Sequence, residues 1–164
     1  STIQHVGKTH RIADFIFTNQ YAEKVTQNDY DNCIYVADFF FTTCPTICPV
    51  MSKNMEVLQS KIKDYPNVKI LSHTVMPEID SVPILKAYAD KHHAIKGKWN
   101  LVTGDKKEIY YMARQSYLAV KTSSSSELYD MVHTENFVLV DSQKRVRGFY
   151  DGTDLKEIEN EEIK

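Results

Sequence analysis

An apolar run that ends in two cysteine–proline pairs constrains the fold of this chain most. Ile34 to Phe41 is almost continuously apolar, a pattern typical of a strand buried on both faces of a sheet. The run is followed by Thr42-Thr43-Cys44-Pro45-Thr46-Ile47-Cys48-Pro49. Proline disfavours helical geometry in the residue before it but suits the first turn of a helix. We therefore expect a helix to begin at Pro45 or Pro49, and the two cysteines cannot both lie inside it.

This junction should activate the two thiols. The N–H groups of a helix's first turn lack intrahelical partners, and the positive end of the helix dipole favours a thiolate. We expect Cys44 and Cys48 to share one exposed turn and to act as a redox pair or as metal ligands. Three cysteines are too few for a disulfide framework. Cys33 precedes the apolar strand, and we expect it to take no part in the chemistry.

The remaining periodicity predicts an α/β fold with a central mixed sheet flanked by helices, the thioredoxin-like arrangement. Ligands of such open sheets gather at the carboxyl ends of strands, where the two cysteines fall. After the cysteines we predict a helix with the apolar stripe Met51, Met55, Leu58 and Ile62, and then a buried strand over 68–75. The next helix starts at 80–83 and has Leu85, Tyr88, Ala89 and His92 on its buried face. A strand over 99–103, a helix opened by a capping box of Asp105 and Glu108, a hairpin of strands 137–141 and 145–150, and a terminal helix from Asp154 complete the prediction.

Length and charge bound the number of domains and the partners. With 164 residues, 42% of them hydrophobic, the chain fits a single domain over residues 1–164. A net charge of −2 with scattered basic residues gives no reason to expect nucleic acid. No run of about 18 apolar residues is present, and the chain opens with Ser1. We expect a soluble portion of a longer precursor, in which residues 1–9 form a loose segment after a removed anchor or signal. We also expect a mobile loop at 123–126.

Two thiolates suit Cu(I), and an added imidazole keeps affinity for Cu(II), so a histidine is the expected third ligand. Five of the six histidines have structural or surface explanations: His5, His10, His73, His92 and His93. His133 lies four residues before the predicted strand at Phe137, and its position leaves a ligand and a surface histidine equally open.

Asp38 lies inside the apolar strand, six residues before Cys44, the spacing at which thioredoxins carry a buried acid. A buried carboxylate is costly unless it is paired, which makes it a functional candidate. We nevertheless expect it to lie at a sheet edge or to be hydrogen-bonded to backbone, in a purely structural role.

The chain resembles the Sco/SenC family of copper chaperones, in which a C-P-x-x-C-P motif and a distant histidine bind copper on a thioredoxin-like fold. The resemblance covers about residues 10 to 155. It implies that Cys44, Cys48 and His133 bind copper as Cu(I) or Cu(II). The matching segments are 41–51, Ile70-Leu71-Ser72 leading to Pro77-Glu78 and Ile84-Leu85-Lys86-Ala87-Tyr88, and His133-Thr134 ahead of 137–141.

The resemblance implies a metallochaperone that delivers copper to, or maintains the thiols of, the binuclear copper site of cytochrome c oxidase. Its partners would be the copper-bearing oxidase subunit or another copper chaperone, and a thiol reductant protein. It would act on the periplasmic side, tethered by an N-terminal anchor or lipid. Two positions depart from the family pattern: Met76 stands where an aspartate is usual, and Val132 where an acidic residue is frequent. We expect Met76 to serve packing rather than to bind metal.

Two other functions compete with copper delivery. A metal-free thiol–disulfide oxidoreductase is favoured by the fold and the helix-terminal thiols, but the CxxxC spacing and the lack of a tryptophan before Cys44 count against it. A redox or copper sensor is the third class. On balance we expect a protein that is not a classical enzyme, although thiol–disulfide exchange remains open.

Overall fold

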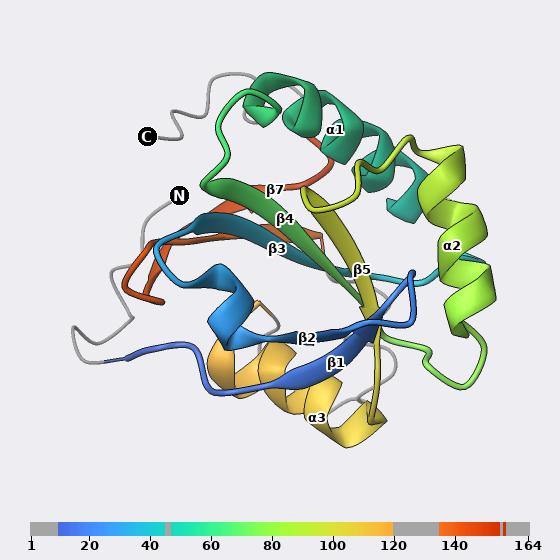
Figure 1. Cartoon of the computed structure of the whole chain (residues 1–164), viewed down its shortest axis with the longest axis horizontal. Coiled ribbons are helices and arrows are strands. Elements are labelled where there is room, and N and C mark those ends of the chain that lie inside the picture. Colours follow the sequence, from blue (N-terminus) through green and yellow to red (C-terminus); the bar gives the residue numbers. More distant parts are fainter. Residues whose placement is uncertain (1–9, 45–46, 120–134, 155, 157–164) are drawn as a thin grey trace.

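A seven-stranded mixed sheet organises the protein. The computed structural model describes residues 10–44, 47–119, 135–154 and 156 (Figure 1). The strand order is β2-β1-β5-β4-β3-β6-β7. The pairs β5–β4 and β4–β3 are parallel, and the other neighbouring pairs are antiparallel. The strands are β1 (Ile16–Asn19), β2 (Lys24–Thr26), β3 (Ile34–Phe40), β4 (Val68–Thr74), β5 (Trp99–Thr103), β6 (Asn136–Val140) and β7 (Val146–Asp151).

Helices cover both faces of this sheet, with α1 and α2 on one side and α3 on the other (Figure 1). Alternate residues of β3 face the two sides, because side chains on a strand have a period of two. Val36 and Phe40 pack with the α1 side, whereas Ala37 and Phe39 belong to the core on the α3 side. The helical elements are α1 (Ile47–Ile62), α2 (Val82–Lys91), α3 (Lys106–Tyr111), the 3-10 turn η1 (Gln27–Tyr30) and the π-helical turn η2 (Met112–Ser116).

The predicted α/β class and central elements are confirmed. Met51, Met55, Leu58 and Ile62 are all buried on α1, and α2 buries Leu85, Tyr88 and Ala89. The hairpin of β6 and β7 pairs antiparallel. None of the helices in the described part of the chain is long and apolar enough to cross a membrane.

Some expectations were wrong. The β1–β2 hairpin was not predicted, because its strands are only four and three residues long and carry polar residues. The capping box at α3 does not form, since the side chain of its N-cap residue Asp105 makes no capping hydrogen bond. The predicted loose segment 1–9, the predicted mobile loop 123–126 and most of the predicted terminal helix lie outside the described residues, so these three stay predictions.

Candidate metal centre

The two cysteines lie where the central strand β3 gives way to helix α1. A turn follows the strand, and it is closed by the N–H of Cys44, which donates to the carbonyl of Phe41 at 3.2 Å. Cys48 lies in the first turn of α1, whose described part begins at Ile47 and has Pro49 in its first turn. The N–H of Cys48 donates to Cys44 Sγ at 3.3 Å. Both thiols are free, and the hydrogen bond from Cys48 N–H to Cys44 Sγ shows that the two cysteines meet at this junction, as the sequence predicted.

The expectation of an exposed pair was wrong, and so was the expectation that the Cys48 thiol is activated. Cys44 is 7% exposed and Cys48 is 3% exposed. Burial raises the pKa of the Cys48 thiol, and a hydrogen bond with Cys44 raises it further, whereas a backbone hydrogen bond of Phe41 lowers it. Desolvation of the charged sulfur is the largest of these effects on the pKa of Cys48.

A buried carboxylate lies beneath this pair. Asp38 occupies the middle of β3, directly opposite Ser72 of β4, and is 2% exposed. The Ser72 hydroxyl donates to Asp38 Oδ1, and Trp99 Nε1 donates to Ser72 Oγ at 2.9 Å. Burial raises the pKa of Asp38 to about 7, against the lowering effect of Ser72. The expectation of an edge position or a backbone partner was wrong, because β3 is an interior strand and the partner is a side chain.

Asp80 is a second buried acid at this end of the sheet. It lies in the loop between β4 and α2, is 0% exposed, and accepts hydrogen bonds from Thr42 and Thr74. In the sequence it served only to mark the start of a helix. No local signal reveals its burial, because its partners lie 38 and 6 residues away.

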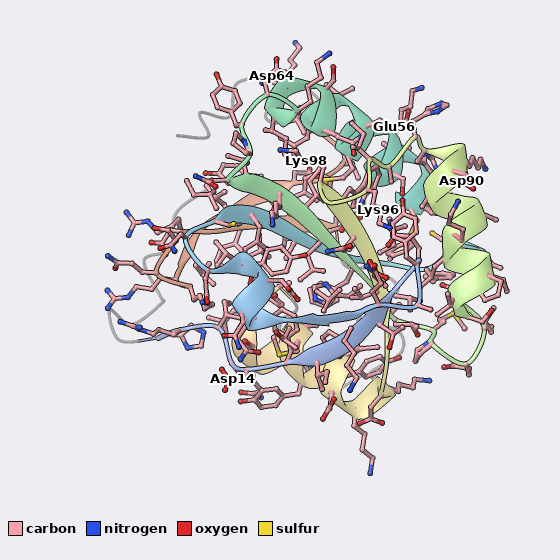
Figure 2. All side chains as sticks on the ribbon, viewed as in Figure 1. Asp14, Glu56, Asp64, Asp90, Lys96 and Lys98 are labelled. Carbon is pink, nitrogen blue, oxygen red and sulfur yellow. The ribbon has the colours of Figure 1, made fainter. Side chains whose placement is uncertain are left out.

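The two buried histidines of the described residues, His73 and His92, have structural surroundings. His73 is fully buried on the other face of the sheet, stacks on Phe39 at 4.5 Å, and makes a hydrogen bond from Nδ1 to the carbonyl of Asp38 at 3.0 Å. Burial lowers the pKa of His73 to about 4. His92 Nδ1 lies 2.6 Å from Glu56, which Figure 2 labels on α1 beside α2.

The predicted third ligand, His133, lies outside the described residues, as does His5. Among the residues that the structure describes, no group of three or more histidine, cysteine, aspartate or glutamate side chains could hold a metal ion. The donor set of two free cysteine sulfurs at one junction still fits a thiophilic ion such as Cu(I), with a further ligand supplied from elsewhere. The third ligand therefore stays a prediction.

Cys33 and Met76 lie where the sequence placed them. Cys33 belongs to the core on the α3 side of the sheet, whereas Cys44 and Cys48 belong to the core on the α1 side. Met76 packs against the α3-side core, in agreement with a packing role.

A cavity of about 560 Å³ lies away from the cysteines, between the start of β1 and α3. Phe15 and Met112 contribute to its apolar lining, and Asp14, labelled in Figure 2, also lines it. Nothing in this cavity links it to the cysteine pair.

Comparison with known proteins identifies the chain. The SCO1/SenC family model matches residues 4–164. A SCO1 protein homolog of Bacillus subtilis is 32% identical over 147 residues, which cover 88% of this chain and 76% of the relative.

Three solved structures are also similar. A SCO1/SenC family lipoprotein from Bacillus anthracis has a TM-score of 0.77 at 28% identity, with 93% of this chain and 95% of the other covered. BsSco, described as a Sco-family cytochrome c oxidase assembly protein with a disulfide switch, has a TM-score of 0.76 at 29% identity, with 94% of each chain covered. ScoI of Arabidopsis thaliana with copper bound has a TM-score of 0.67 at 26% identity, with 92% of this chain and 99% of the other covered. The motif, the fold and the family match agree, and this chain belongs to the SCO1/SenC family.

Proposed function

We propose that this protein is a copper chaperone for cytochrome c oxidase assembly, which binds one copper ion through Cys44, Cys48 and His133. The observation that carries the proposal is that the two free cysteines meet at the strand-to-helix junction, where Cys48 N–H donates to Cys44 Sγ. Two sulfur ligands at the end of a rigid central strand suit Cu(I), and an imidazole adds the nitrogen that Cu(II) prefers. Relatives support the same use, since one is copper-bound and one is an assembly protein for the oxidase.

Within this function, Cys44 and Cys48 supply the thiolate ligands and His133 the imidazole. Copper would pass to the partner by exchange of one ligand at a time, so the partner is the copper-bearing oxidase subunit or another copper chaperone. A Cys44–Cys48 disulfide carries no thiolate and cannot hold the ion, so a thiol reductant must first supply two electrons and two protons. Redox state would therefore control loading.

We place this chemistry outside the cytoplasm, on the membrane surface. A Bacillus anthracis relative is a lipoprotein, and that form of anchoring would hold the domain close to a membrane-bound oxidase. Delivery of copper and reduction of the partner's thiols are both compatible with such a location.

A metal-free thiol–disulfide oxidoreductase is the second candidate. The observation that favours it is the same pair of cysteines at the strand-to-helix junction, together with a relative described by its disulfide switch. Such an enzyme would need no histidine, because electrons would pass through the Cys44–Cys48 disulfide alone.

Copper titration distinguishes the two functions. Reduced protein is titrated with Cu(I) in the presence of a chromophoric Cu(I) chelator and, separately, with Cu(II). The chaperone requires one equivalent of tightly bound copper in the wild type and in Cys33→Ser, and transfer of that copper to the soluble copper-bearing domain of the oxidase subunit. Absence of stoichiometric binding in the wild type, combined with catalytic reduction of a protein disulfide, would assign the oxidoreductase instead.

A further inference from the structure

Asp80 ties two loops together at the cysteine end of the sheet. Its carboxylate accepts hydrogen bonds from the backbone N–H of Thr42 at 3.0 Å and from the Thr42 hydroxyl. Thr74, the last residue of β4, donates its hydroxyl to the same carboxylate at 2.6 Å. A fully buried carboxylate that accepts three hydrogen bonds is held in one orientation, because loss of any donor leaves charge unsatisfied in the interior.

Thr42 connects this carboxylate to the candidate metal centre. It is a central residue of the turn that runs from Phe41 to Cys44 and is closed by the N–H of Cys44 on the Phe41 carbonyl. Beyond the turn, Cys44 Sγ accepts the N–H of Cys48. A continuous series of hydrogen bonds and one short backbone turn therefore run from the Asp80 carboxylate to the cysteine pair.

The negative charge of Asp80 also has a favourable position. It directly precedes Ser81, the N-cap residue of the ten-residue helix α2, where the helix dipole stabilises an anion. Its own N–H donates to the Met76 carbonyl at 2.9 Å, which holds the β4–α2 loop in place. The Asp80 carboxylate is thus held in place by its own loop as well as by its hydrogen bonds to Thr42.

We propose that Asp80 is a positioning residue for the copper pair. Its carboxylate holds Thr42, and through Thr42 it sets the backbone turn that aims the Cys44 sulfur at Cys48. Where the test of this inference measures copper affinity, it rests on the proposed function. Partners that hold metal ligands in place typically change metal affinity by about 10–100-fold when they are lost.

Variants at the two threonines test the proposal without removing the acid. Asp80→Ala would strip the acceptor from two hydroxyls and one amide and is expected to destabilise the fold, so it is not informative alone. Thr42→Val removes one hydroxyl but keeps the backbone N–H bond to Asp80, and Thr42→Ser restores the hydroxyl. Thr74→Val is the matched control, because it removes the hydroxyl that donates to the same carboxylate from β4. It also removes the acceptor of the Met76 N–H.

Cu(I) affinity is measured by competition with a chromophoric chelator, and stability by urea denaturation of the metal-free protein. We expect Thr42→Val to bind Cu(I) about tenfold or more weakly, and Thr42→Ser to bind within about threefold of the wild type. Thr74→Val should lose stability while its copper affinity stays within about threefold of the wild type. Unchanged affinity in Thr42→Val, or equal losses in Thr42→Val and Thr74→Val, would overturn the positioning role.

A second readout does not depend on copper. The Cys44–Cys48 disulfide takes up two electrons and two protons from glutathione to give two thiols and oxidised glutathione, and the equilibrium constant depends on the geometry of the turn. We expect Thr42→Val to change this constant by about fivefold or more and Thr74→Val to leave it unchanged. If the wild type binds no copper, the proposed function fails, and an unshifted constant in Thr42→Val would then separately overturn the role of Asp80.

Discussion

Replacing Asp38 by asparagine should change how the stability of this protein depends on pH. Asp38 is 2% exposed on the central strand, and burial raises its pKa from 3.8 to about 7. Asparagine has nearly the same shape, and its amide oxygen can still accept the hydrogen bond from Ser72. Asp38→Asn therefore removes the titration with little change in packing.

The sign follows from where the proton is bound. Between pH 3.8 and about 7 the folded protein keeps the Asp38 proton, whereas the unfolded chain has released it. Unfolding therefore releases a proton, and rising pH favours the unfolded state. The contribution of Asp38 to stability is complete below pH 3.8 and is lost as the pH rises through about 7. A difference of about three between the two pKa values corresponds to roughly 4 kcal/mol.

His73 contributes in the opposite direction over part of this range. Burial lowers its pKa from 6.5 to about 4, so between these two pH values the unfolded chain binds a proton at His73 and the folded protein does not. This contribution is complete above pH 6.5 and is lost as the pH falls through about 4. The wild-type profile should consequently be flattened between about pH 4 and 6.5. Only the difference between variant and wild type isolates Asp38.

Urea denaturation of reduced, metal-free protein, followed by the fluorescence of Trp99, measures this difference. From about pH 4 to about pH 8 we expect the free energy of unfolding of Asp38→Asn to rise relative to the wild type by roughly 4 kcal/mol. Asp90→Asn is the matched control, because the Asp90 side chain is 63% exposed and should show no comparable trend. A difference between Asp38→Asn and wild type that stays constant within about 1 kcal/mol across the range would refute the reasoning.

Further predictions concern the cysteines and His133. Cys44→Ser and Cys48→Ser should each abolish tight copper binding, a larger loss than the roughly 10–100-fold caused by losing a supporting residue, because a hydroxyl is a poor copper donor. Retained stoichiometric copper in both variants, measured by competition with a chelator, would exclude these ligands. His133→Ala should weaken Cu(II) binding, followed by electron paramagnetic resonance, at least about tenfold more than Cu(I) binding; equal losses for the two ions would count against His133. Cys33→Ser should leave copper affinity and the Cys44–Cys48 disulfide unchanged, and a mixed disulfide of Cys33 in the monomer would contradict its burial on the opposite side of the sheet.

Much of the fold could be predicted because its signals are local. The apolar run of β3 and the helical stripe of α1 depend on the periods of a strand and a helix, which a sequence displays directly. The spacing of the two cysteines likewise places both sulfurs at one junction, and the structure confirms that junction. The β1–β2 hairpin escaped prediction because its strands are too short to display a period of two, and the pairing of β1 with β5 is a long-range contact that no local pattern shows.

The supporting groups of the candidate site depend on tertiary contacts. Asp38 and Ser72 are 34 residues apart, and Asp80 and Thr42 are 38 residues apart. Parallel pairing of β3 with β4 aligns Asp38 with Ser72, and it brings the segments that follow the two strands, with Thr42 and Asp80, to the same end of the sheet. No local pattern specifies which polar residue will find a partner. Sequence alone therefore located the cysteines and singled out Asp38, but it could not identify Asp80 or the partners of either acid.

Burial of the cysteine pair favours copper binding over metal-free thiol exchange. An oxidoreductase needs a free thiolate as its nucleophile, but desolvation raises the pKa of Cys48 and so disfavours its charged form. Two bare thiolates would place two negative charges in a region where Cys44 is 7% exposed and Cys48 is 3% exposed. One Cu(I) ion cancels one of these charges and pairs both sulfurs, and a disulfide removes both charges. Burial therefore opposes free thiolates and favours three states of the pair: protonated, metal-bound and disulfide. A redox-controlled copper carrier requires this preference, because it alternates between the metal-bound and the disulfide state.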